Sequence, residues 1–250
     1  MKKLLYLLLF LPVLSYSQDS IYLPTTHNGI IIKHHNYVIS YVEKFEGAEW
    51  CAYELLPEET IDNTDRKSGE FMRDPLVETG SARHSDYTKS GYDRGHLAPA
   101  ADMKFSANAM FESFYMSNVL PQAPKLNRNT WKNLEADIRN YVIRTRDTLY
   151  IVTGGIILNI TEPNGIIYIG EKNRVAVPQF FYKIVYNESN GKIISFAIPN
   201  INIEYGDYFE GQSTVDAIEI FTGVNFFPEM NELRQEILES YKNDTNWLRQ

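Results

Sequence analysis

The sequence predicts an α+β fold: a mixed, largely antiparallel central sheet flanked by helices. Segments of strand-type composition both precede and follow one long amphipathic helix over residues 126–142, and two further helices are expected near the C-terminal end. Strands on both sides of a central helix, with helices closing the chain, are typical of this class. No repeat, linker or low-complexity run divides residues 18–250, so we expect one domain.

The first residues have the pattern of a signal peptide, predicted over residues 1–17. Lys2 and Lys3 precede an apolar run over residues 4–14, and small residues stand where a signal peptidase would cut before Gln18. A membrane anchor is the alternative, but the run is shorter than the roughly 20 residues that span a bilayer. We therefore expect a secreted or periplasmic protein with no membrane insertion after cleavage.

An N-terminal hairpin is predicted from strands at residues 37–41 and 48–56 with a turn over residues 43–47. The single cysteine, Cys51, lies in the second strand, so we interpret it as buried and structural. A catalytic thiol is the alternative, and it would need a nearby histidine and an electropositive setting.

Three histidines, His27, His34 and His35, precede the hairpin in a polar segment. Adjacent histidines in an extended chain point to opposite faces, so they cannot easily chelate one ion together. We expect an exposed strand edge here.

Residues 57–91 form a long polar stretch without a helical or strand period. Loops of this length in compact domains are usually functional or disordered. Because Arg66 and Arg73 lie in it, we expect a loop that faces the substrate, with an ordinary solvated surface loop as the alternative.

A strand-type stretch over residues 92–96 is followed by Pro99, which disfavours a continued ladder. A short amphipathic helix is expected over residues 108–114, with Met110, Phe111 and Phe114 on one face. Residues 115–119 then predict a strand that ends before Pro121.

The helix over residues 126–142 has the clearest period in the chain. Trp131, Leu134, Ile138 and Tyr141 recur at helical spacing and predict one buried stripe. Asn127 and Glu135 are eight residues apart, which separates them by roughly 80° around a regular α-helix. One group near the helix start could thus touch an ion while the other reaches its water shell.

The C-terminal part alternates strand and helix signals. We expect strands at residues 148–158, 175–186 and 192–198, a helix to residue 221 capped by Ser213, and a last helix over residues 228–243.

Charge is unevenly distributed along this acidic chain, whose net charge is −8. Residues 64–146 hold 13 Lys and Arg against 10 Asp and Glu, whereas the rest of residues 18–250 hold 9 against 22. The positive charge thus gathers in the segment that holds Arg94, His96 and Asn127. This pattern suits an enzyme that grips a few phosphates and argues against an extensive nucleic-acid coat.

The residue types in this segment are those that phosphodiester hydrolysis needs. A neutral histidine such as His96 can act as a base, and an Asn127 carbonyl can hold a hard cation. Arg94 can bind phosphate oxygens, and Glu135 offers a carboxylate. Residue types alone leave a structural histidine equally plausible for His96.

The motif Asp93-Arg94-Gly95-His96, with Leu97-Ala98-Pro99 after it, resembles the signature of the DNA/RNA non-specific endonucleases. This is the endonuclease-G-like branch of the ββα-metal nucleases. The resemblance extends in order and spacing through residues 114–118, Pro121-Gln122, Leu126-Asn127, Trp131 and Leu134-Glu135, with weaker echoes over most of residues 37–228. It implies a ββα-metal motif in the fold.

The resemblance also implies roles for individual residues. His96 would be the general base for the attacking water, and Asn127 the one direct protein ligand of Mg²⁺, with Mn²⁺ as a substitute. Glu135 would orient waters of the ion's shell, and Arg66 would steady charge at the phosphate, with Arg73 as its competitor. Arg94 would place the phosphate.

Three further positions receive supporting roles from the same resemblance. Asn118 and Gln122 would shape the site around His96 and bind substrate, and Asp93 would support the backbone geometry. Because members of the family are often dimers, the resemblance also allows for a homodimer.

The leading hypothesis is therefore an exported Mg²⁺-dependent endonuclease that cuts DNA and RNA with little sequence preference and leaves 5′-phosphate ends. The nearest alternative is a phosphodiesterase acting on small nucleotides. A binding protein that kept the scaffold without catalysis is another, but it would be expected to lack one of His96, Asn127 or Glu135.

Overall fold

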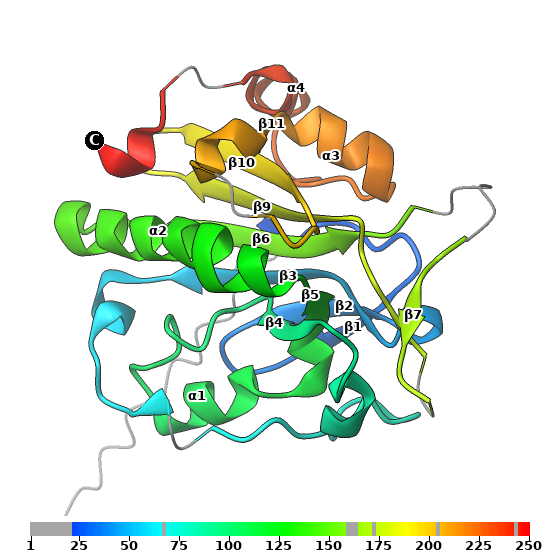
Figure 1. Cartoon of the computed structure of the whole chain (residues 1–250). Helices are drawn as coiled ribbons and strands as arrows, with labels where there is room; N and C mark the ends of the chain where they lie inside the picture. The colour runs from blue at the N-terminus through cyan, green and yellow to red at the C-terminus, as the bar shows by residue number, and fades with distance from the viewer. Residues whose placement is uncertain (1–21, 67–68, 159–164, 172–173, 204–205, 243–244) are drawn as a thin grey trace, which may run out of the picture.

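The computed structural model describes residues 22–66, 69–158, 165–171, 174–203, 206–242 and 245–250 (Figure 1). The predicted signal peptide lies outside these residues. Among the described residues, no helix is long and apolar enough to cross a membrane.

A seven-stranded antiparallel sheet forms the centre of the molecule and confirms the predicted fold class. Its order is β1-β2-β3-β6-β9-β10-β11. The strands are β1 (Ile30–Lys33), β2 (Val38–Val42), β3 (Gly47–Leu55), β6 (Leu149–Ile156), β9 (Phe180–Asn187), β10 (Lys192–Pro199) and β11 (Gln212–Ser213). The predicted hairpin is β2 and β3, which pair in antiparallel register around a 3-10 turn over Glu43–Phe45.

Two short antiparallel pairs lie outside this sheet: β4 (Asp93–His96) with β5 (Val119–Gln122), and β7 (Tyr168–Ile169) with β8 (Val175–Ala176). The helices are α1 (Ala107–Ser113), α2 (Lys132–Thr145), α3 (Val215–Thr222) and α4 (Glu232–Ser240). Short 3-10 turns cover Pro57–Thr60, His84–Tyr87, Met116–Asn118, Tyr208–Gly211 and Trp247–Arg249.

The sheet separates two apolar cores. The stripe predicted on the long helix is buried on one face, where Trp131, Leu134 and Ile138 pack with Ile151 and Phe181. The other face is covered by α3 and α4, through residues that include Val215 and Ile218. In Figure 1, α3 and α4 lie on one side of the molecule, and α1 lies with β4 and β5 on the opposite side.

Residues 115–119 do not form the predicted strand. Met116–Asn118 is a 3-10 turn, and the strand begins only at Val119 and includes Pro121. The Asn118 side chain holds this turn by hydrogen bonds with the backbone of two earlier residues, Ala98 and Ser113. Pro121 is tolerated because β5 pairs only with β4, which leaves the other edge of β5 without a ladder.

Three smaller predictions are also corrected. Phe111 is 44% exposed, because adjacent helix residues lie about 100° apart and Met110 takes the buried side of α1. His34 is buried and within 3.0 Å of Asp74, so it does not belong to an exposed edge. Thr214, not Ser213, caps α3 by accepting a hydrogen bond from the backbone of Ala217.

Candidate active site

The site is built from the β4–β5 pair and the start of the long helix. His96 is the last residue of β4, and Val119 pairs with it across the ladder. Gly95 must be glycine here, because a Cβ would lie 2.4 Å from Oε1 of Gln122 on the neighbouring strand. The close approach of the two strands thus fixes the backbone that presents His96.

His96 lies in an aromatic and nearly closed setting. Its exposed fraction is 8%, and its ring centroid is 5.2 Å from that of Phe71 and 5.1 Å from that of Phe114. Burial, with a smaller contribution from the positive charge of Arg66, lowers the pKa of His96 to about 3. The imidazole is therefore neutral at neutral pH, the form that a general base needs.

Asp93 orients the amide of Asn127. The Asn127 Nδ2 donates to Asp93 Oδ2 at 2.9 Å. A carboxylate only accepts hydrogen bonds, and ion pairing with Arg128 helps to hold the pKa of Asp93 below its usual range against the effect of burial. The amide nitrogen must therefore face Asp93, which leaves Oδ1 of Asn127 free on the other side. The sequence had suggested that Asp93 supports only the backbone geometry. In the structure it also holds the side chain of Asn127.

The long helix does not begin as a regular α-helix. Residues Leu126–Trp131 form a π-helical turn, which continues into α2. A π turn contains one extra residue. Two residues that are eight apart and span such a turn are therefore separated by a smaller angle around the helix axis than the roughly 80° expected in a regular α-helix. Asn127 and Glu135 accordingly line the same cavity. Such turns are frequent at functional sites.

This cavity has a volume of about 350 Å³ and is rich in cations. Besides Arg66, three of the predicted site residues line it: His96, Asn127 and Glu135. Four cationic side chains line it: Arg66, Arg128, Lys132 and Arg139. Such a wall suits a phosphate, whose non-bridging oxygens carry the negative charge.

Arg66, and not Arg73, reaches this cavity. Arg73 donates through Nε to the backbone oxygen of Ser81 at 2.9 Å and is not among the lining residues. The loop that carries both arginines therefore faces the site through Arg66.

Arg94 is not among the residues that line the cavity, so its position does not support the predicted contact with phosphate. Its guanidinium donates to the backbone oxygen of His84 at 2.9 Å and lies 5.6 Å from the ring centroids of both Phe71 and Tyr87. Phe71 also contacts His96, so Arg94 supports the aromatic wall behind the histidine.

Asn118 and Gln122 are fully buried, so their predicted contact with substrate is also wrong. Asn118 accepts from the backbone of Ala98 and donates to Ala98 and Ser113, which fixes the chain just after His96. Gln122 packs against Gly95. Both side chains shape the backbone around the histidine without reaching the cavity.

Sequence reasoning missed Arg128, Lys132 and Arg139 as lining residues. A signal was available, because residues 128, 132 and 139 recur at i, i+4 and i+11 on a helix whose opposite face is apolar. Asp93 accepts two hydrogen bonds from Arg128, from Nε at 2.7 Å and from Nη2 at 2.6 Å. The Asp93 carboxylate thus positions both the Asn127 amide, whose oxygen can bind a metal ion, and the Arg128 guanidinium.

The donor set fits a hard divalent cation. Oxygen atoms are the ligands that Mg²⁺ prefers, and it usually keeps several waters. Asn127 Oδ1 could hold such an ion directly, and Glu135 could accept hydrogen bonds from the waters around it. Burial raises the pKa of Glu135 to about 7, and nearby positive charge favours its ionised form.

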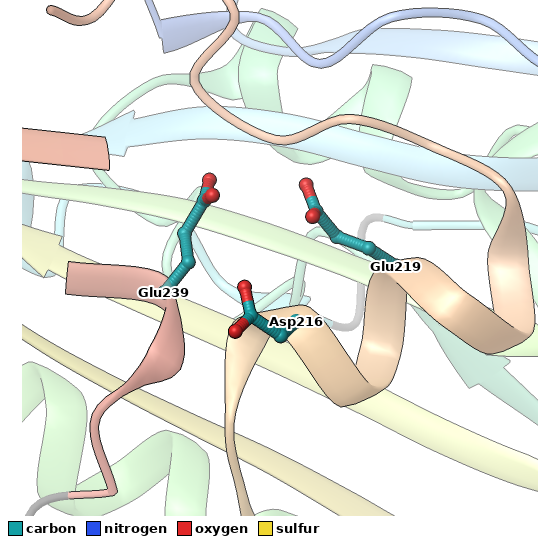
Figure 2. A group of neighbouring side chains, drawn as sticks. All are labelled: Asp216, Glu219 and Glu239. Atoms are coloured by element: carbon teal, nitrogen blue, oxygen red, sulfur yellow. The ribbon is translucent and has the colours of Figure 1, made fainter. Parts of the chain in front are cut away.

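A second group of acidic side chains lies on the opposite face of the sheet (Figure 2). Asp216 and Glu219 on α3 and Glu239 on α4 bring ligand oxygens within 4.8 Å of one another. Glu239 is buried, and this burial, followed by the charge of Glu219, raises its pKa to about 8. A proton on Glu239 relieves the repulsion, so the arrangement needs no cation.

The chain has clear relatives among known nucleases. A family model described as DNA/RNA non-specific endonuclease matches residues 19–233. Mitochondrial endonuclease G of Bos taurus is 37% identical over 204 residues, which cover 78% of this chain and 68% of that protein. A nuclease of a Nostoc species is 33% identical over 229 residues, which cover 86% of this chain and 79% of that protein.

A solved structure agrees with these matches. A chain in the crystal structure of the EndoG/EndoGI complex has a TM-score of 0.75 and 30% sequence identity to this one, over 83% of this chain and 90% of that chain. From the extent of these matches, the chain belongs to the family of DNA/RNA non-specific endonucleases.

Proposed function

We propose that this nuclease is an exported, Mg²⁺-dependent endonuclease that hydrolyses DNA and RNA with little sequence preference and leaves 5′-phosphate ends. One observation carries the proposal: a neutral His96 and the free amide oxygen of Asn127 border one cavity walled by four cations. A base, a cation holder and phosphate ligands are the parts that phosphodiester hydrolysis requires.

In this proposal His96 accepts the proton of the attacking water at Nδ1. Nε2 is buried and has no hydrogen-bond partner among the described residues, which leaves Nδ1 as the nitrogen available to a water in the cavity. The aromatic rings around His96 hold the imidazole in place and keep it neutral. Asp93 meanwhile holds Asn127 with Oδ1 directed away from the carboxylate.

A magnesium ion would be held by Asn127, with Glu135 orienting waters of its shell. When bound, the ion would supply positive charge that stabilises the extra negative charge at phosphorus. Mn²⁺ offers similar chemistry and is the expected substitute. Arg66 and Arg139 would bind the non-bridging oxygens, since both line the cavity beside His96 and Glu135.

The exposed side chains of Arg128 and Lys132 would bind phosphates that flank the cleaved bond. Contacts to phosphates position a nucleic acid without reading its bases. A wall of cations without base readout therefore accounts for cleavage of both DNA and RNA with little sequence preference.

The test is to incubate the purified protein with supercoiled plasmid and with RNA, in Mg²⁺ or in EDTA, beside His96→Ala. His27→Ala is the matched control, because His27 is exposed and only its backbone nitrogen bonds to Glu49. Metal-dependent cleavage of both substrates by wild type and His27→Ala, lost in His96→Ala, is expected. Cleavage of a small chromogenic diester but not of plasmid would favour a phosphodiesterase acting on small nucleotides.

Export and a homodimer also remain proposals. Export rests on the sequence pattern over residues 1–17, and N-terminal sequencing of protein recovered from the periplasm or medium should start at Gln18. A homodimer follows from the family, and light scattering after size exclusion should give twice the chain mass of the processed protein.

A further inference from the structure

Three polar side chains cross the middle of the sheet on the face covered by α2. Cys51 on β3 pairs in register with Thr153 on β6, which pairs with Lys183 on β9. Residues aligned across a ladder point to the same face, and Cys51 belongs to the apolar core that includes Trp131. Lys183 is 0% exposed, so its ammonium group lies in this core.

A buried ammonium needs hydrogen-bond acceptors and an opposite charge. Nζ of Lys183 donates to Oγ1 of Thr153 at 2.5 Å and lies 5.1 Å from the ring centroid of Trp131. Neither partner carries a negative charge. Lys183 gives no other hydrogen bond among the described residues, so these two contacts leave its charge uncompensated.

The compensating charge comes from Glu135. Trp131 and Glu135 are one helical turn apart, so the ammonium against the Trp131 ring lies below the Glu135 side chain. Among the charges acting on Lys183, that of Glu135 is the largest, and Lys183 is likewise the largest charge acting on Glu135. Lys183 on the sheet is thus the main positive charge near the Glu135 carboxylate on the helix.

A second buried pair completes the group. Asp102 is 2% exposed and accepts hydrogen bonds from Arg139 Nη1 at 2.5 Å and from the Tyr53 hydroxyl at 2.9 Å. Because Asp102 already has its own cation, Lys183 is the main positive charge that balances Glu135, with smaller contributions from Arg139 and Arg66. The two carboxylates and two cations together carry no net charge; Glu135 and Arg139 line the cavity, and Lys183 and Asp102 are buried behind them.

We propose that Lys183 is a positioning residue of the nuclease site: its buried ammonium keeps Glu135 charged and directed into the cavity, and thereby sets the affinity for the divalent ion. This inference rests on the proposed role of Glu135 in holding waters of the ion. Lys183 itself is buried and touches neither substrate nor ion. Without it, Glu135 would be left with the weaker attractions of Arg139, which already pairs with Asp102, and of Arg66.

The test is metal binding without nucleic acid, measured by titration calorimetry of the full chain with Mn²⁺. Lys183→Met keeps the length of the side chain and removes its charge. Supporting groups around metal sites typically contribute 10- to 100-fold in affinity, so we expect binding weaker by roughly 10-fold. The melting temperature is expected to fall, because removing one partner of a buried charge pair leaves the other uncompensated. Mn²⁺ affinity is therefore measured at a temperature where the variant is folded.

A double-mutant cycle with Glu135→Gln separates this role from a general structural one. If Lys183 acts through Glu135, Lys183→Met weakens Mn²⁺ binding in the wild-type background and changes nothing in the Glu135→Gln background. Equal weakening in both backgrounds, or wild-type affinity in folded Lys183→Met, overturns the proposal. Cleavage of plasmid by the wild type, assayed in parallel, reports separately on the proposed function.

Thr153→Val serves if Lys183→Met does not fold. It removes the hydroxyl that holds Nζ and keeps the charge, so the same cycle should show a smaller loss of affinity that also disappears with Glu135→Gln. Unchanged Mn²⁺ affinity in Thr153→Val, or a loss that persists with Glu135→Gln, contradicts the proposal.

Discussion

Replacing Asp93 by asparagine should weaken metal binding without touching the metal ligand. In the wild type, the Asp93 carboxylate accepts the Nδ2 hydrogen bond of Asn127 at 2.9 Å, so Oδ1 is the atom left for an ion. An asparagine at position 93 can donate as well as accept, so the Asn127 amide can turn and present its nitrogen to the cavity. The shape of residue 93 is unchanged, which isolates the effect of the charge.

The magnitude follows from the type of hydrogen bond. A hydrogen bond to a charged group contributes about 1.5 to 3 kcal/mol, which corresponds to a preference of roughly 10- to 100-fold for the productive orientation. We therefore expect the dissociation constant for Mn²⁺ to rise by roughly 10- to 100-fold in Asp93→Asn, measured by titration calorimetry.

Arg128→Gln is the matched control for this experiment. It removes the ion pair with Asp93 but leaves the hydrogen bond between Asp93 and Asn127. Its affinity for Mn²⁺ should stay close to that of the wild type. The reasoning is refuted if folded Asp93→Asn binds Mn²⁺ as tightly as the wild type, or if Arg128→Gln loses as much affinity as Asp93→Asn.

Three further predictions concern protonation, charge and stability. Burial holds the pKa of His96 at about 3, so its ring resonances in the metal-free protein should keep their neutral-form shifts from pH 8 down to pH 5; a midpoint near 6.5 would contradict this. Lys132→Gln should reduce the slope of log affinity for duplex DNA against log salt in EDTA by about 0.9, whereas Lys33→Gln on the β1 edge should not. Glu239 has a folded-state pKa of about 8 against its ordinary 4.5, so the folded protein holds the proton more tightly and loses stability as pH rises between these values. Glu239→Gln should remove this pH dependence and raise the free energy of unfolding at pH 8 by on the order of 2 kcal/mol, measured by urea titration. An unchanged pH dependence in the variant would show that Glu239 is not the group responsible.

Much of the fold was accessible from the sequence because local periodicity records which side of an element is buried. The stripe of Trp131, Leu134 and Ile138 is buried as predicted, and the hairpin of β2 and β3 forms as predicted. The predicted strand over residues 115–119 failed because side-chain bonds of Asn118 hold a turn there. Strand propensity does not account for such long-range bonds.

The sequence by itself determined the segment that carries the site and the residue types in it. His96, Asn127 and Glu135 were identified from the order and spacing of a motif, and they line one cavity. The structure alone decided where the long side chains reach. Arg94 turns away to the backbone of His84, since an arginine has several rotatable bonds that sequence spacing does not fix.

Only the tertiary structure could place the groups that act through others. Asp93 and Asn127 are 34 residues apart, and their hydrogen bond depends on how β4 meets the start of the long helix. Lys183 lies on a distant strand, and it comes below Glu135 only because β9 joins the sheet beside β6 under α2. Strand order and helix docking are set by burial of apolar surface over the whole chain, so no local stretch of sequence encodes these contacts.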